Sequence, residues 1–358
     1  MCIRDRYGAA DRMVNIDVPV GNGWSDPLRE AGYGWMGKWL LGQGDGRPIK
    51  EDSFEVEDPK SPDMLCFDGN QIPADSETVV TLNRKRAEAL RAACSTPPTD
   101  EAGWTQQAGT MREDLWDVFG GRPADVAPEA RTLDTFEWNG LRVETLAITT
   151  EPGMTVAALL LRSATAEGQA PAAIFLGESD KQEVRGDVRA QKLLEEGWCV
   201  LALDTRGMGE TIGKYPQNQI VSNGVHRGRS LFAQRVWDVL QAGRYLATRS
   251  DVAAHRLRGV GLGPSAVLAL YAAALGDGFE EVEAVRPLAS YRFFIENDQP
   301  QPLWLCVPNI LKVADVAQAA ALAAPSSVTI VEAVGYGNAP LDATAAQSEF
   351  AFAEAVHK

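Results

Sequence analysis

The stretch "RGVGLGPSAVLAL", residues 258 to 270, decides the fold. Apolar residues run up to Leu262, a glycine-rich turn follows, and an alanine-rich segment begins after Pro264. This order predicts a strand, a tight turn and the start of a helix. Two chemistries use that arrangement: a catalytic serine displayed on a sharp turn, and a phosphate bound at a helix N-terminus.

The phosphate alternative rests on a G-x-G-x-x-A pattern formed by Gly261, Gly263 and Ala266. The acids Glu280 and Glu283 follow downstream. In dinucleotide-binding domains this pattern normally follows the first strand, whereas here several predicted strands come before it. We therefore favour the serine-type turn and expect no organic cofactor.

From near residue 104 onward, segments with strand and helix patterns alternate along the chain. Such alternation predicts a mostly parallel, twisted sheet flanked by helices and joined by right-handed crossovers. Three of the predicted strands lead into "IFLGESD" (174–180), "ALDTRGMGET" (202–211) and "GVGLGPSAVLAL" (259–270). In α/β-hydrolases, strands in this order end in an oxyanion loop, a D-x-R-G-x-G turn and the G-x-S-x-G nucleophile elbow.

With these motifs, residues 134 to 355 resemble the acetyl xylan esterase-like, dienelactone hydrolase-related branch of the α/β-hydrolase superfamily. The resemblance implies the α/β-hydrolase fold. It also implies hydrolysis of carboxylic esters, including acetyl groups on xylan, without a metal or an organic cofactor. A carbohydrate ester is therefore the ligand that we expect.

The catalytic residues of that family do not carry over to this chain. The nucleophile position falls on Gly263, which has no side chain to attack a carbonyl. The acid position falls near Gly335, with no aspartate until Asp342, and the histidine position falls beyond Lys358. The resemblance therefore implies a degenerate site with weak or no hydrolase activity.

Ser265 and His226 are the remaining candidates for catalysis. A register shift of two residues would bring Ser265 to the nucleophile position, but Val267 would then replace the second glycine and crowd the turn. We therefore expect Ser265 to cap the helix instead. His226 is the histidine of this domain that could overlook the pocket mouth, although a position on a surface loop is the simpler interpretation.

The loops around the predicted elbow hold two further sets of residues. The oxyanion-loop candidates are Gly177, Glu178 and Pro264, although an acidic side chain beside an oxyanion is unfavourable. For the D-x-R-G-x-G turn we expect structural roles, in which charged groups bond to nearby backbone and to each other. The residues of that turn are Asp204, Arg206, Gly207 and Gly209.

Composition breaks predict four segments. Residues 1–6, "MCIRDR", are a predicted non-native leader, and residues 7–50 resemble the last helix of a preceding hydrolase domain. Residues 51–103 are predicted to be a linker with one helix, and residues 104–358 an α/β-hydrolase domain truncated at its C-terminus. The missing upstream domain is then an expected partner. A truncated sheet would also expose an unpaired edge, from which we expect pairing with a second copy.

The composition narrows the classes of partner. The 358 residues are 45% hydrophobic and 23% charged with a formal net charge of −15, which is typical of a soluble protein and argues against nucleic acid and membrane surfaces. The five cysteines, odd in number and without zinc-site spacing, indicate free thiols and no metal. This thiol pattern slightly favours the cytoplasm, although the true N-terminus is predicted to lie upstream.

Three functional hypotheses follow. The first is a relative of carbohydrate esterases in which Gly263 has replaced the nucleophile and hydrolase activity is weak or absent. The second is a non-catalytic hydrolase-fold module that supports a neighbouring domain or binds a carbohydrate. The third is an active serine esterase that uses Ser265.

Overall fold

The computed structural model describes residues 7–19, 21, 23–67, 71–93, 96–98, 100–296 and 302–358. The predicted leader, residues 1–6, lies outside this description. The chain divides into two compact units, Met1–Ser76 and Glu77–Lys358. The division falls inside the predicted linker because helix α3 (Val79–Ala93) packs onto the larger unit, where Ala87 is buried. The predicted boundary at 103/104 also falls within a helix, α4 (Glu101–Val118).

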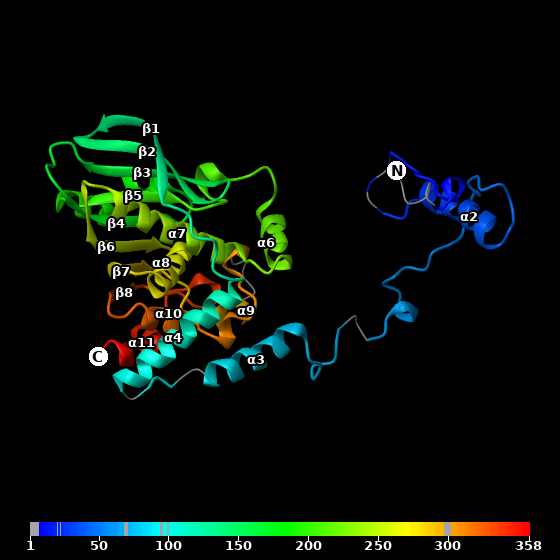
Figure 1. The fold of residues 1–358 in the computed structure, drawn as a ribbon. Helices are drawn as coiled ribbons and strands as arrows, with labels where there is room; N and C mark the ends of the chain where they lie inside the picture. Colours follow the sequence, from blue (N-terminus) through cyan, green and yellow to red (C-terminus); the bar gives the residue numbers. More distant parts are fainter. Residues whose placement is uncertain are drawn as a thin grey trace. The chain divides into compact units, whose positions relative to one another are not determined.

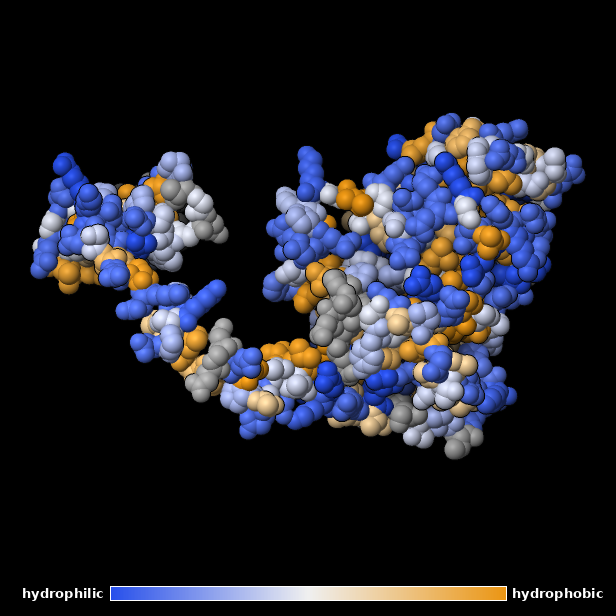
Figure 2. All heavy atoms as spheres, turned by 180° about the vertical axis from the view of Figure 1, so that it is seen from behind, coloured by the Kyte–Doolittle hydropathy of each residue, from blue (hydrophilic) through white to orange (hydrophobic). Residues whose placement is uncertain are grey.

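The smaller unit contains one α-helix among its described residues, α2 (Asp26–Leu40), together with the short 3₁₀ segments η1 (Ala10–Arg12) and η2 (Pro62–Met64). Helix α2 has Pro27 in its first turn, where the missing amide hydrogen of proline costs no hydrogen bond. Arg29 of α2 pairs with Asp26 and Glu51. Apolar side chains remain on the surface of this unit, as the orange atoms of Figure 2 show.

The larger unit is built on one eight-stranded sheet with the order β1-β2-β3-β5-β4-β6-β7-β8 (Figure 1). The first three strands and β5 pair antiparallel, and β5, β4, β6, β7 and β8 form a parallel block. The mostly parallel sheet is therefore confirmed. Its strands are β1 (Glu129–Trp138), β2 (Leu141–Glu151), β3 (Met154–Ser163), β4 (Ala170–Leu176), β5 (Cys199–Asp204), β6 (Val252–Leu262), β7 (Phe279–Val285) and β8 (Ser327–Val331).

Helices flank this sheet, and most of them share one face. Besides α3 and α4 they are α5 (Val188–Glu195), α6 (Gln217–His226), α7 (Leu231–Thr248), α8 (Pro264–Leu275), α9 (Tyr291–Glu296), α10 (Val316–Leu322) and α11 (Ala343–Val356). The described part of this unit also contains the 3₁₀ segments η4 (Lys181–Arg185), η5 (Gly209–Thr211), η6 (Leu303–Leu305), η7 (Ile310–Lys312) and η8 (Tyr336–Asn338). The helices α7 and α8 lie against one face of the sheet (Figure 1).

The core of that face is aromatic. Phe232 of α7 lies edge-on to Tyr271 of α8 and to Phe119, and it stacks on Trp304. Such ring pairs add roughly 0.5–1.5 kcal/mol each to the free energy gained by burying their area. On the opposite face, Leu193 of α5 packs in a smaller cluster with strand side chains. The larger core therefore lies on the α7/α8 side.

Beyond α5, the second face carries charged side chains instead of apolar ones. Arg258 of β6 pairs with Glu281 of β7 at 2.9 Å, and Arg189 of α5 pairs with Glu283 at 2.7 Å. All four groups are about one-third exposed. Parallel sheets usually bury both faces under helices, so the charged surface of β6 and β7 is a local departure from that pattern.

The strand order places a switch point between β4 and β6. The chain leaves β4 toward β5 on one side, whereas β6 leads toward β7 on the other. Crevices that bind ligands form at such points, outside the carboxyl ends of the strands. Gly261 lets α8 start directly there, because a Cβ at this position would lie 2.6 Å from the Cα of Ala266.

In the described parts of the chain, no single helix has both the length and the apolar character needed to cross a bilayer. One bent pair, Leu303–Lys312 with Val316–Leu322, meets that test by length and composition.

Candidate functional site

The turn between β6 and α8 is centred on Gly263. This residue has φ 53° and ψ −131°, and its N–H donates to the Val285 carbonyl at 2.8 Å. A sharp, strained strand-to-helix turn is the form of the nucleophile elbow. The structure therefore places residue 263, and not residue 265, at the bend.

Glu178 fills the space next to this bend. A Cβ built on Gly263 would lie 2.8 Å from Cδ of Glu178 and 2.9 Å from its Oε2. Real Cβ atoms do not approach other atoms so closely. The carboxylate, which comes from the loop after β4, thus occupies the place into which a side chain at position 263 would extend.

Of the three oxyanion-loop candidates, Glu178 and Pro264 line the cavity at the elbow, but they do not form a donor pair. Pro264 follows the bend and has no amide hydrogen, so the prediction that it contributes to an oxyanion hole is wrong on chemical grounds. The N–H groups of Glu178 and Ser179 already donate to the Glu183 carboxylate, at 2.8 and 2.7 Å. Gly177 is buried below them.

Ser265 lies inside the first turn of α8 and is 1% exposed. Its hydroxyl has no hydrogen-bond partner among the described residues. The prediction that it caps the helix is wrong, because Gly263 is the residue at the N-cap and no side chain bonds to the free N–H groups there. A buried hydroxyl is also poorly placed for attack on a substrate in the cavity.

The structure brings no described imidazole to the bend. His226 is the last residue of α6, is exposed, and lies 3.5 Å from the Ser222 hydroxyl. It does not line the cavity beside Gly263. Asp342, the first aspartate after the predicted acid position, caps α11 through the N–H of Ala345.

A cavity of about 350 Å³ lies at the bend. This is near the lower end of the range of roughly 300–1,000 Å³ that small-molecule sites occupy. Its walls come from the loops that follow β4, β6, β7 and β8, and from the η6 segment. The lining residues are Glu178, Gly263, Pro264, Arg286, Leu288, Pro302, Leu305, Val334 and Asn338.

The D-x-R-G-x-G turn is held by ion pairs with other segments. Asp204, fully buried, accepts bonds from the N–H and the Nζ of Lys181, both at 2.7 Å, and from the N–H of Glu210. A Cβ on Gly209 would lie 2.2 Å from this carboxylate, which explains the glycine. Asp204 therefore holds this turn in place by bonding to three donors from two segments.

Arg206 bonds elsewhere. Two nitrogens of its guanidinium, Nε and Nη2, donate to the Asp238 carboxylate of α7, and a third, Nη1, forms an ion pair with Glu151 at 2.8 Å. The expected bond between Asp204 and Arg206 is thus wrong, because each residue has a closer partner of opposite charge on another element. Arg235 donates to the carbonyls of Arg206 and Gly207, and burial lowers the pKa of this arginine to about 9.

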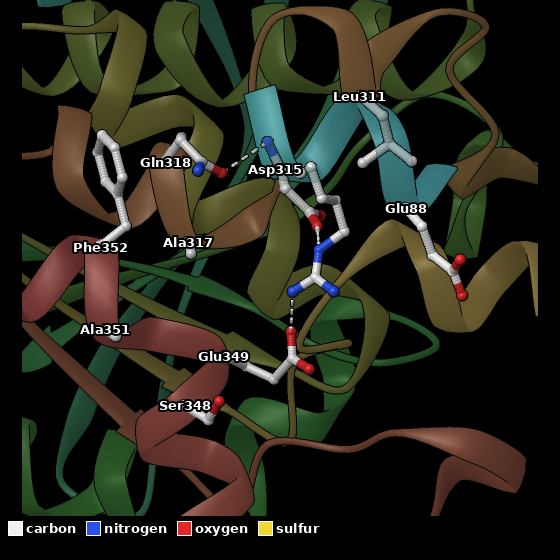
Figure 3. Close-up of a pocket in the computed structure, with 11 residues that line it drawn as sticks. Glu88, Leu311, Asp315, Ala317, Gln318, Ser348, Glu349, Ala351 and Phe352 are labelled. Carbon is white, nitrogen blue, oxygen red and sulfur yellow. Dashed lines mark hydrogen bonds and ion pairs between the residues drawn. The ribbon is translucent and has the colours of Figure 1, made fainter. Parts of the chain in front are cut away.

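A second cavity, of about 400 Å³, lies where α3, α10 and α11 meet. Arg91 of α3 reaches Asp315 at 3.4 Å and Glu349 at 2.5 Å. Figure 3 shows these two carboxylates on separate elements with the guanidinium between them. Burial raises the pKa of Asp315. This cluster attaches α3 to the larger unit and was not signalled by any sequence motif.

Two further groups of residues bear on the sequence predictions. Among the residues that the structure describes, no three His, Cys, Asp or Glu side chains cluster so as to hold a metal ion. The described cysteines, Cys66, Cys199 and Cys306, are free thiols.

With the fold and this geometry in hand, we compared the chain with known proteins. No family model matches it. The Bacillus subtilis (strain 168) protein named "Putative hydrolase YtaP" is 24% identical over 229 residues, which cover 60% of this chain and 76% of the relative. The solved structure titled "putative acetyl xylan esterase" from Bacteroides fragilis has a TM-score of 0.62 at 14% identity, covering 80% of this chain and 82% of that one.

Two further structures extend this comparison. The methylesterase BT1017 has a TM-score of 0.56 at 21% identity over 76% of this chain and 60% of its own. A glucuronoyl esterase from Solibacter usitatus has a TM-score of 0.54 at 16% identity, covering 73% of this chain and 82% of that one. The protein therefore has the α/β-hydrolase fold. The three solved structures described above have esterase in their titles, and the Bacillus subtilis relative is named a putative hydrolase.

Proposed function

We propose that the larger unit is an esterase-related hydrolase-fold domain that does not hydrolyse esters and instead binds a small ligand in the cavity beside Gly263. The observation that carries this proposal is the Glu178 carboxylate, which lies where the side chain of a nucleophile would be. A negative charge at that place also opposes the oxyanion that forms during ester hydrolysis.

Two other features support the same conclusion. The proline after the bend removes one oxyanion donor, and loss of a single such donor lowers kcat by about 10²–10³-fold. Glu183 occupies the N–H groups of the opposite loop. Neither feature is repaired by returning a hydroxyl to position 263.

The test is covalent labelling with a fluorophosphonate probe and turnover of p-nitrophenyl acetate, with an active serine esterase as positive control. We expect neither labelling nor turnover for the chain as it stands, nor for the G263S variant. Labelling that disappears in S265A would overturn the proposal in favour of the Ser265 hypothesis. Labelling that persists in S265A would also overturn it.

Carbohydrate binding and support of an upstream domain stay predictions. The relatives act on sugar esters by their names, which supports a sugar ligand. None of the nine described lining residues is aromatic, however, so this cavity offers no ring on which a sugar could stack. Titration with acetylated xylo-oligosaccharides tests the first idea directly.

A further inference from the structure

Two unpaired charges of opposite sign line the cavity beside Gly263. They are the Glu178 carboxylate and the Arg286 guanidinium, both on exposed residues. The main-chain N–H of Glu178 donates to the Glu183 carboxylate, and that of Arg286 donates to the Val331 carbonyl at 2.7 Å. Within the described structure neither side chain has an ion pair, so both charges are free to meet a ligand.

Arg286 is held in an unusual backbone conformation. Its φ is 54°, in the left-handed region that residues with a side chain seldom adopt, and it precedes Pro287, which further disfavours that region. Its own N–H is bonded to β8, and its neighbour Val285 accepts the bond from the Gly263 N–H. Strain that the surroundings maintain in this way tends to occur at ligand sites.

The remaining walls of the cavity are mostly apolar. Five of the nine lining side chains carry no polar group: Pro264, Leu288, Pro302, Leu305 and Val334. The position at the switch point of the sheet is the usual place for a ligand in this type of fold. A ligand matched to these walls has a short apolar body with a cationic and an anionic end.

We infer that this cavity binds a small zwitterion, an amino acid whose ammonium group meets Glu178 and whose carboxylate meets Arg286. The inference rests on the proposed function, since in a working esterase the space taken by Glu178 would hold the nucleophile. Charge-assisted hydrogen bonds to each end would set the orientation of the ligand, and the apolar walls would limit its length.

Calorimetric titration with a series of ω-amino acids tests this inference. Glycine, 4-aminobutyrate and 6-aminohexanoate differ only in the distance between their charges, and butylamine and butyrate each carry one of the two. We expect one member of the series to bind the full chain about tenfold or more tightly than either single-charge compound, as expected for one additional charged hydrogen bond.

Two variants separate the two ends of the site. E178Q should lower the affinity for the zwitterion and for butylamine about tenfold and leave the affinity for butyrate unchanged. R286Q should lower the affinity for the zwitterion and for butyrate and leave the affinity for butylamine unchanged. The control variants E195Q and R131Q alter exposed residues outside the cavity. They should bind each compound with the same affinity as the unmodified chain. Thermal unfolding of each variant checks that it is folded.

The inference would be overturned if no member of the series bound. It would also be overturned if either variant lowered the affinities for butylamine and butyrate equally. Fluorophosphonate labelling separates this failure from failure of the proposed function. An unlabelled chain that binds no zwitterion leaves the non-catalytic proposal standing and removes only the ligand class, whereas a labelled chain removes both.

Discussion

The ammonium group of Lys181 lies 2.7 Å from the carboxylate of Asp204, and both side chains are buried. Lys181 follows β4 and Asp204 ends β5, so this ion pair ties the loop that carries Glu178 to the end of the neighbouring strand. The N–H of Lys181 bonds to the same carboxylate. Because Glu178 belongs to the loop that Lys181 anchors, the position of the Glu178 carboxylate depends on this contact.

Removal of one partner of this pair should destabilise the larger unit strongly. D204N removes the buried counter-charge of Lys181 and leaves only the exposed Glu210 carboxylate, at 3.3 Å, for which we expect a loss of about 3–5 kcal/mol in the free energy of unfolding. Urea unfolding followed by circular dichroism measures it. K192Q, at an exposed side chain of α5, is the control, and a loss below about 1 kcal/mol in D204N would contradict the prediction.

A side chain at position 263 should conflict with Glu178. G263S combines an unfavourable backbone conformation, which costs about 1–3 kcal/mol, with a contact to Glu178 that is too close. The double variant G263S/E178A removes the contact and should recover part of the lost stability. A double-mutant cycle measures the coupling between the two sites, and additive effects would show that the two side chains do not compete for one space.

Asp251 should contribute to acid stability. The Arg249 guanidinium, at 2.8 Å, holds the pKa of this carboxyl below its ordinary value of 3.8. The stabilisation is then complete above the unfolded-state pKa and is lost as the pH falls through the lower folded-state value. D251N should therefore be less stable at neutral pH and lose less stability between neutral pH and strong acid. Chemical denaturation at several pH values tests this. If the free energy of unfolding of D251N and of the unmodified chain changed with pH in parallel, the prediction would be contradicted.

The edge strand β8 should support self-association. Val328 and Ile330 of this strand line a groove of about 630 Å³ together with Phe350 of α11, and Glu332 and Glu354 add charges to its walls. An unpaired edge with apolar side chains invites pairing with another strand. We propose a dimer through β8 that dissociates on dilution and is weakened in I330K. F136K on the opposite edge strand, β1, is the control, and sedimentation of a monomer at all concentrations would disprove the dimer.

Most elements of the sheet were predictable because their patterns are local. The continuous apolar run of β4 and the helical periodicity of α7 each reflect burial that the segment shows by itself. Strand β1 carries no such signal, because nearly all of its positions are exposed and no alternation marks it. Helix α10 lacks one for the opposite reason: all seven of its residues are buried, which leaves no polar face.

The amino-acid sequence by itself determined that no hydroxyl stands at position 263 and that no amide hydrogen follows it, because these are properties of glycine and proline. Only the tertiary structure decided what replaces them. Glu178 comes from the loop after β4, which the sequence motif had placed near the elbow, whereas Arg286 comes from the loop after β7 and no local pattern signals its place. Their meeting at Gly263 follows from the strand order, which brings the carboxyl ends of separate strands to one crevice.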